Sequence, residues 1–375
     1  MITRPIENKK TKIFDYIKLL GKDVIVVSDG SGWVIDNISS NISKALNAKG
    51  IKSAVVSNFF LPFLTLLRGK TFYFVDRWIY LDKKNYDFFR KLSQNNKVIA
   101  MWWHSAANED NVKLGKSIEI LKSLLPYFET ISIPCFIEKE LLIEKGLPKN
   151  KLQVVPEGIE SFFKKPTFEE KSFKRKELGI PESSFCIGFF QKDGSGWGEG
   201  LEPKLEKGPD IFIETIRRLS KKYNNIFVVL TGPARGYVKK RLVSIGVPFI
   251  HKYLKDYKDI VKYYSTLDLY LITSRTEGGP KSVLESLACG VPVVSTCVGM
   301  SKDVIEDNIN GFLCEIENVE QLCKRVEALV SDKNLRDNFS RNGIETIKKY
   351  SWDNIADIFI GKCLPEKYSK FQRVN

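Results

Sequence analysis

Short apolar runs recur along the whole chain, and stretches with helical periodicity separate them. The first half contains such runs at 23–28, 53–57, 71–75, 97–103 and 130–134. The second half contains them at 185–190, 226–231, 248–251, 269–273 and 293–296. Continuously apolar strands spaced by helices are typical of parallel sheets that are covered on both faces. Two such sets predict an α/β chain with two Rossmann-like, doubly wound parallel-sheet domains.

The boundary between the two sets falls near Pro156-Glu157-Gly158, after a strand-like run at 152–155 and before the polar, basic stretch at 164–176. A further helix is expected after Ser351, because four apolar residues follow it at helical spacing: Trp352, Ile355, Ile358 and Phe359. We therefore expect an N-terminal domain, a C-terminal domain and a closing helical segment, at 1–157, 158–350 and 351–375. Ligands of open parallel sheets bind beyond the carboxyl ends of the strands, so we searched the loops there for functional residues.

Charge and composition exclude little on their own. The net charge is +14, which suits nucleic acid, an anionic membrane surface or an acidic small substrate. The basic residues are scattered, which disfavours a nucleic-acid-binding protein. Two histidines and seven cysteines without a CxxC pair predict no metal site and no disulfide framework. The polar N-terminus and the lack of an apolar stretch of ~20 residues predict a cytoplasmic chain.

The most informative segment runs from Ser274 to Pro292. It follows an apolar strand, turns through two adjacent glycines and enters a helix that Gly290 stops. Glu277 should lie in the turn and Glu285 one turn into the helix. Free N–H groups at a helix start favour a phosphate, and a carboxylate accepts two hydrogen bonds from a ribose diol. The plain alternative is a strand-turn-helix with two ordinary surface glutamates.

Two glycine-rich loops also follow strands. One runs from Gly188 to Gly200 and leads to Lys207, and the other is Asp29-Gly30-Ser31-Gly32-Trp33. Glycine lets the backbone approach a pyrophosphate closely, and lysine supplies a compensating charge. A flexible loop and a tight turn are the ordinary alternatives. The dehydrogenase fingerprint is incomplete in the second loop, because no third glycine follows.

Glu277 and Glu285 are separated by seven residues and followed by Ala-Cys-Gly-Val-Pro-Val-Val. This pattern resembles the E-x7-E motif of the family 4 retaining glycosyltransferases, which belong to the glycosyl transferases group 1. Three further segments resemble the same family: KLQVVPEGIE at 151–160, NINGFL at 308–313 and the helix after Ser351. The resemblance implies the GT-B fold, in which two Rossmann-like domains face a central cleft. It also implies that the C-terminal domain binds the donor and that the closing helix crosses back.

The resemblance implies roles for single residues. Glu285 would hold the ribose, Glu277 would orient the sugar hydroxyls, and His104 would face the transferred sugar from the first domain. The loop at Tyr253, close to His251, would hold the nucleotide base. The other residues that would contact the donor are in the two glycine-rich loops and in the turn after Glu277. They are Gly30, Gly32, Lys192, Lys207, Gly278, Gly279 and Lys281.

Two departures from the family pattern bear on the donor. The arginine that normally follows the strand is absent, and Gln191 and Lys192 occupy its region. A lysine cannot reproduce the bidentate fork of an arginine. Pro280 stands where the family often has a second glycine, and proline removes an N–H donor. The identity of the sugar therefore cannot be carried over.

These features predict a retaining glycosyltransferase that moves a hexose-type sugar from a nucleotide-diphosphate sugar to a glycan or lipid-linked acceptor. We expect no cofactor besides the donor and no metal. The implied route is a front-face substitution in which the leaving diphosphate helps to deprotonate the acceptor. A sugar-nucleotide epimerase or a sugar phosphorylase would keep the same fold. The non-enzyme alternative is a basic nucleic-acid-binding protein.

An apolar segment at 58–70 is a candidate membrane contact. Its phenylalanines and leucines precede Arg68 and Lys70, and an interfacial helix needs an apolar face beside basic residues. Pro62 is tolerated only in a first turn, so the helix should begin near it. Such a helix would add an anionic membrane surface to the partners and place the protein at the inner face of the membrane. The alternative is a helix buried between two strands.

Overall fold

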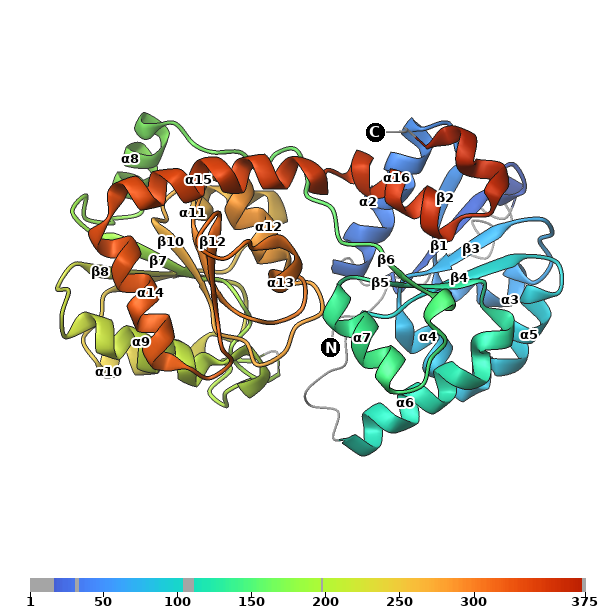
Figure 1. The fold of residues 1–375 in the computed structure, drawn as a ribbon, viewed down its shortest axis with the longest axis horizontal. Helices are drawn as coiled ribbons and strands as arrows, with labels where there is room; N and C mark the ends of the chain where they lie inside the picture. The colour runs from blue at the N-terminus through green and yellow to red at the C-terminus, as the bar shows by residue number, and fades with distance from the viewer. Residues whose placement is uncertain (1–16, 31–33, 104–110, 197, 373–375) are drawn as a thin grey trace.

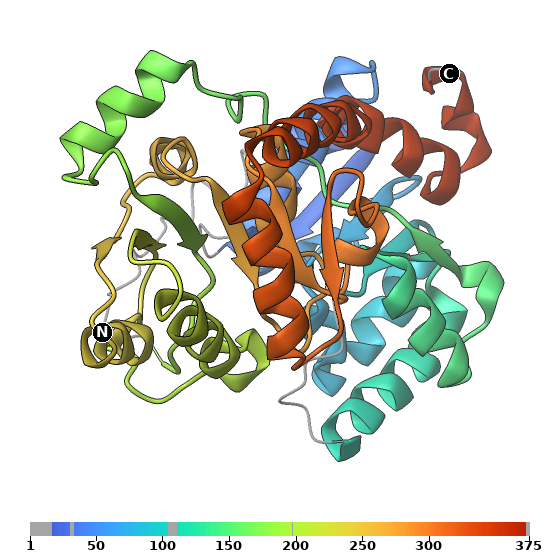
Figure 2. The ribbon, with the colours of Figure 1, turned by 60° about the vertical axis from the view of Figure 1, so that its left-hand side comes forward.

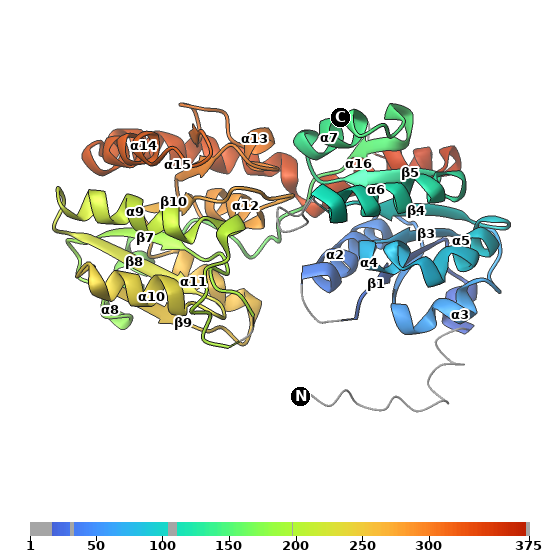
Figure 3. The ribbon, with the colours of Figure 1, turned by 90° about the horizontal axis from the view of Figure 1, so that it is seen from below.

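The computed structural model describes residues 17–30, 34–103, 111–196 and 198–372. Within these ranges the chain forms two α/β domains that lie side by side (Figures 1 and 3). Each domain is built on one six-stranded sheet whose neighbouring strands are all parallel. This arrangement confirms the predicted pair of doubly wound parallel sheets.

The sheet of the first domain has the strand order β2-β1-β3-β4-β5-β6. Its strands are β1 (Val24–Ser28), β2 (Ser53–Ser57), β3 (Thr71–Phe74), β4 (Lys97–Met101), β5 (Thr130–Ile133) and β6 (Leu152–Val154). Its helices are α2 (Val34–Ala48), α3 (Leu61–Leu64), α4 (Arg77–Leu81), α5 (Tyr86–Ser93), α6 (Asn111–Leu124) and α7 (Phe136–Glu144). Ile25 and Val27 pack with α3 to α6, whereas Val24 and Val26 pack with α2. Because both faces are covered, every residue of β1, β3 and β5 is buried.

The sheet of the second domain has the order β12-β11-β10-β7-β8-β9. Its strands are β7 (Phe185–Phe189), β8 (Ile226–Thr231), β9 (Phe249–Lys252), β10 (Leu269–Ile272), β11 (Val293–Thr296) and β12 (Gly311–Cys314). Its helices are α8 (Phe168–Glu177), α9 (Pro209–Ser220), α10 (Gly236–Ser244), α11 (Ile260–Tyr264), α12 (Lys281–Ala288), α13 (Ser301–Val304), α14 (Val319–Ser331) and α15 (Lys333–Ile347). Ile187 packs with α9, α10 and α14, whereas Cys186 packs with α11 and α12. Figure 2 shows α8 set off from the sheet at the edge of this domain.

The chain passes between the domains twice, and the two crossings run side by side. The backbone N–H of Ile159 donates to the carbonyl oxygen of Tyr350 at 2.8 Å, which joins the outgoing linker to the returning one. The last helix, α16 (Trp352–Cys363), lies over the first domain (Figure 1). Its residues Ile355 and Phe359 pack in the same cluster as Val24 of β1. The end of the chain therefore forms part of the core of the first domain.

The helix expected near Pro62 is short, since α3 begins at Leu61 and ends at Leu64. The segment forms a 3-10 turn and the four-residue α3, with Leu64 and Leu67 buried in the core of the first domain. Phe63 and Leu66 remain exposed. Four residues are too short for an amphipathic face, and the alternation of buried and exposed side chains reflects a surface turn. In the described part of the chain, no helix has the length and apolar character needed to cross a bilayer.

The predicted strands omit β12. This strand is four residues long and follows the polar turn that carries Asn308, whose φ of 67° lies in the left-handed region. A short run after such a turn has no periodicity of its own, so only its pairing with β11 defines it as a strand.

Candidate functional site

The candidate site lies at the carboxyl ends of β7 and β10. These strands are neighbours in the sheet, and the chain order reverses between them, which marks the point where open α/β sheets bind ligands. Gln191 follows β7, Ser274 follows β10, and Lys207 stands just before α9. Gly208 brings Lys207 close to β10, since a Cβ at this position would lie 1.8 Å from the carbonyl oxygen of Thr273.

Glu277 is the centre of this group. Its Oε2 pairs with Nζ of Lys207 at 2.6 Å. Its Oε1 accepts from Nε2 of Gln191 at 2.8 Å and from Oγ of Ser274 at 2.9 Å. Its side chain is only 9% exposed. The structure thus brings together two of the predicted residues, Glu277 and Lys207, and adds Gln191 in the region where the family has its arginine.

Glu285 lies on α12 in a different environment. Its side chain is buried, and its carboxylate accepts hydrogen bonds from the hydroxyls of Tyr264, at 2.7 Å, and of Tyr257. Burial raises the pKa of Glu285, while Lys281 and the two tyrosine hydroxyls act in the opposite direction. Neither tyrosine was predicted from the sequence. Their seven-residue spacing, two helical turns, is the signal that could have placed them on one face.

Lys281 faces the linker and the first domain. Its Nζ donates to Oε1 of Glu160 at 2.7 Å and to Oδ1 of Asn37 at 2.9 Å. The turn before it is tightly enclosed. Gly279 contacts Glu157, and the carbonyl oxygen of Gly278 accepts from the N–H of Met300 at 2.9 Å. In this structure Lys281 therefore links the two domains. The turn before it packs against Glu157 and is hydrogen-bonded to Met300.

The glycine-rich loop after β7 is anchored by an ion pair that the sequence analysis did not foresee. Nε of Arg235 lies 3.1 Å from Oδ2 of Asp193, and both side chains are fully buried. Gly194 and Gly200 pack against the backbone at residue 234, where a Cβ on either would lie 2.4 Å from the carbonyl oxygen. The glycines thus allow close packing of this loop onto the start of α10.

Lys192 lies on the same loop. Partial burial lowers its pKa, and so does the nearby charge of Lys204. The side chain of His251 is half-buried, and its Nε2 lies 2.8 Å from the carbonyl oxygen of Gly232. Burial lowers the pKa of His251. Tyr253 is 58% exposed, just beyond β9.

In the first domain, Gly30 adopts a φ of 70° after β1, and its N–H donates to Oδ1 of Asp36 at 3.2 Å. This carboxylate, on the first turn of α2, also binds the hydroxyl of Ser28. Gly30 therefore makes the turn that the glycine loop predicts. Gly32 and His104 lie outside the described residues.

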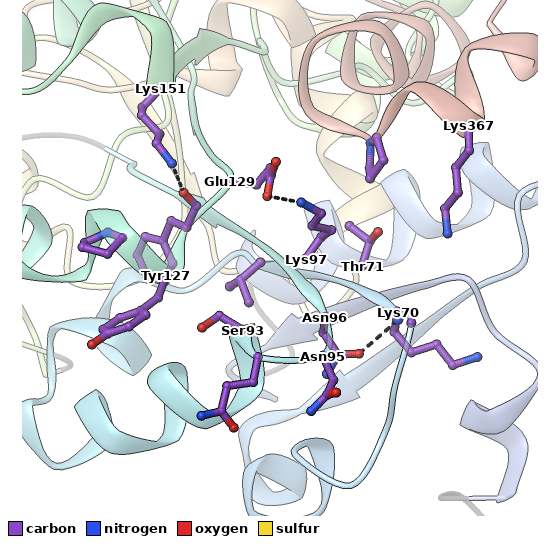
Figure 4. Close-up of a pocket in the computed structure, with 16 residues that line it drawn as sticks. Lys70, Thr71, Ser93, Asn95, Asn96, Lys97, Tyr127, Glu129, Lys151 and Lys367 are labelled. Carbon is purple, nitrogen blue, oxygen red and sulfur yellow. Dashed lines mark hydrogen bonds and ion pairs between the residues drawn. The ribbon is translucent and has the colours of Figure 1, made fainter.

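A separate cavity of about 590 Å³ opens at the amino-terminal ends of β3 and β4 (Figure 4). Lys70, Lys97 and Lys151 line it, and Lys97 pairs with Glu129 at 2.8 Å. None of the predicted site residues lines this cavity. It lies at the amino-terminal ends of the strands, whereas the candidate site lies at the carboxyl ends of the strands of the second sheet. Across the described ranges, no group of three or more His, Cys, Asp or Glu side chains is arranged to hold a metal ion.

The whole fold is that of the GT-B class. The HepE protein of Anabaena, solved in complex with UDP, superposes with a TM-score of 0.71 at 15% identity, covering 89% of this chain and 97% of that one. Residues 202–346 match the family described as glycosyl transferases group 1. This match supports the resemblance to that family over the second domain, and the GT-B fold that the resemblance implies is confirmed.

Two curated relatives show how far the similarity extends. An uncharacterised glycosyltransferase of Methanocaldococcus jannaschii is 25% identical over 249 residues, which are 64% of this chain and 61% of the relative. The N,N'-diacetylbacillosaminyl-diphospho-undecaprenol alpha-1,3-N-acetylgalactosaminyltransferase of Campylobacter jejuni is 27% identical over 228 residues, 59% of this chain and 56% of the relative. The chain thus spans less than two thirds of the length of either relative.

Proposed function

We propose that this protein transfers a hexose-type sugar, with retention, from a nucleotide-diphosphate sugar to a glycan or lipid-linked acceptor. The observation that carries the proposal is the Glu277–Lys207 pair at the switch point of the second sheet. Lys207 supplies a positive charge for a diphosphate, and the adjacent N–H groups at the start of α12 add to it. Glu277 supplies the carboxylate that orients sugar hydroxyls beside it.

The chemistry asked of these residues is positioning and charge stabilisation. As the bond between the sugar and the diphosphate breaks, negative charge grows on the leaving oxygen. Lys207, Lys192 and the N–H groups of α12 would stabilise this charge, and Glu277 would hold the sugar in place. Glu285 would bind the ribose beside the two tyrosines. This route needs no cofactor and no metal beyond the nucleotide sugar.

A thermal-shift screen tests donor binding. A ligand that binds only the folded protein raises its melting temperature, so we would screen UDP, GDP, ADP and their sugars. UDP comes first, because the HepE structure holds it. A stabilising nucleotide sugar is then tested for turnover with a radiolabelled sugar. Label in a new glycoside supports transfer, label in an isomeric nucleotide sugar supports epimerisation, and label in a sugar phosphate supports a phosphorylase.

A membrane contact remains a proposal for lipid-linked acceptors. Phe59, Phe63 and Leu66 are 51%, 40% and 64% exposed on one surface turn, and Arg68 and Lys70 follow directly. Apolar side chains beside basic ones suit an anionic bilayer. We expect co-sedimentation with phosphatidylglycerol vesicles but not with phosphatidylcholine vesicles. Replacing Phe63 and Leu66 together with serine should abolish it, whereas an unchanged bound fraction would reject the contact.

A further inference from the structure

Glu157 is a buried acid that the proposed mechanism does not use. It lies in the linker between the domains, and its side chain is 2% exposed. Within the described residues, neither of its carboxyl oxygens has a hydrogen-bond partner. On one side it lines a small apolar cavity with Ile38, Tyr73 and Trp352. Burial of an unpaired carboxylate in such surroundings is unfavourable, so this group keeps its proton.

On its other side, Glu157 contacts the turn that follows Glu277. A Cβ built on Gly279 would lie 2.5 Å from Oε1 of Glu157 and 3.7 Å from Cβ of Pro134, which follows β5. Only a glycine fits in this space without displacing the carboxyl group. The turn that carries Glu277 therefore packs against Glu157 of the linker and against Pro134 of the first domain.

We propose that Glu157 is a positioning residue that supports the turn 277–280 as a neutral acid, and that loss of its proton weakens the binding of a nucleotide diphosphate. The proposal rests on the proposed function, because it takes this turn to be part of the donor site. It adds a residue of the linker to the groups that control donor binding.

The charges around Glu157 explain the direction of the effect. Lys281 and Glu285 face it from α12, Glu160 from the linker, Glu277 from the turn and Tyr73 from β3. Burial raises the pKa of Glu157 to about 8; the charge of Lys281 lowers it, and the three other glutamates raise it. Lys281 is already paired with Glu160. Ionisation therefore adds one more negative charge where a diphosphate has to approach.

The test compares the protein with Glu157→Gln, which keeps the shape of the side chain and stays neutral. Calorimetry measures UDP affinity from about pH 6 to about pH 9.5, and the titration of the nucleotide itself is common to both proteins. We expect the affinity of the unchanged protein to fall about tenfold relative to that of Glu157→Gln as the pH rises across the pKa of Glu157. Parallel profiles would overturn the positioning role.

Glu138→Gln is the matched control. Glu138 is also buried in the first domain, where its Oε2 accepts from Nε1 of Trp102 at 3.3 Å, and its replacement should leave the pH profile unchanged. Gly279→Ala is a second variant that presses a methyl group onto Glu157. It should weaken UDP binding at every pH, and an unchanged affinity would contradict the contact between the turn and Glu157.

Urea unfolding without nucleotide separates this inference from the proposed function. The pKa of Glu157 is raised from 4.5 in the folded protein. The contribution of the protonated Glu157 to the free energy of unfolding is fully present below about pH 4.5, and it is lost as the pH rises through about 8. The unchanged protein should therefore lose stability relative to Glu157→Gln over this window, and a constant difference would overturn the buried neutral acid. If that difference appears but no nucleotide diphosphate binds, the donor-site assignment fails and only the buried acid stands.

Discussion

The two carboxylates of the E-x7-E pattern sit in opposite environments. Glu277 lies among a lysine, an amide and a hydroxyl at the end of β10. Glu285, one turn into α12, is enclosed by two tyrosines. Glu277 is held by the cation of Lys207 and by polar side chains that a ligand can displace. Glu285 is fixed by the neutral hydroxyls of two tyrosines. Spacing in sequence therefore places the two acids, but their neighbours decide which chemistry each can perform.

The largest effect should come from Glu277→Gln. Glutamine keeps the size of the side chain but removes the charge that pairs with Lys207, so turnover should fall about 100-fold or more. Affinity for the bare nucleotide should stay within about twofold, because the role proposed for Glu277 is to orient the sugar. Steady-state kinetics and calorimetry measure the two quantities. A proportionate loss of nucleotide affinity would show that both glutamates serve the nucleotide and would remove the contrast between them.

Glu285→Ala should have the opposite pattern. Loss of the ribose contact should weaken nucleotide-diphosphate binding by roughly 1.5–3 kcal/mol, the range for hydrogen bonds to charged groups. Calorimetry with the nucleotide measures it, and circular dichroism checks the fold. Glu345→Ala, on the exposed face of α15, is the control and should bind normally. Normal binding by a folded Glu285→Ala would reject the ribose role.

Lys207→Met tests whether the cation beside Glu277 serves the diphosphate. The substitution keeps the length of the side chain and removes its charge. We expect affinity for the nucleoside diphosphate to fall about tenfold and affinity for the nucleoside to remain unchanged. An unchanged affinity for the nucleoside diphosphate together with a loss of turnover would mean that Lys207 only keeps Glu277 in place.

The smallest effects should come from the removal of single hydroxyls, and Tyr264→Phe should be the larger of the two. It removes one hydroxyl from the buried wall and leaves Oε2 of Glu285 without its donor, which should cost about 1–2 kcal/mol of stability. Urea unfolding measures this cost. Ser274→Ala, which removes a hydroxyl from Glu277, is the matched comparison at the other end of the motif. It should cost less, because Lys207 and Gln191 still satisfy Glu277.

The architecture and one half of the site followed from the sequence. Apolar runs predicted the strands, the motif placed Glu277 in the turn after β10 and Glu285 on the following helix, and the glycine-rich loop after β7 led to Lys207. The partners of these residues did not follow, because Tyr257, Tyr264, Gln191 and Glu160 meet them only through the fold. The short length of α3 did not follow, because the apolar side chains at 58–70 alternate between core and solvent instead of following a helical face.

The return of α16 to the first domain affects the order in which the two domains can fold during synthesis. During synthesis, β1 to β6 leave the ribosome long before residues 352–363, which complete the cluster that covers one face of their sheet. Until then α2 covers only part of that face, so the first domain, which is made first, is completed last. The second domain has its own two clusters and can close earlier. The usual order, in which domains fold from the N-terminus onward, is thus reversed by one helix.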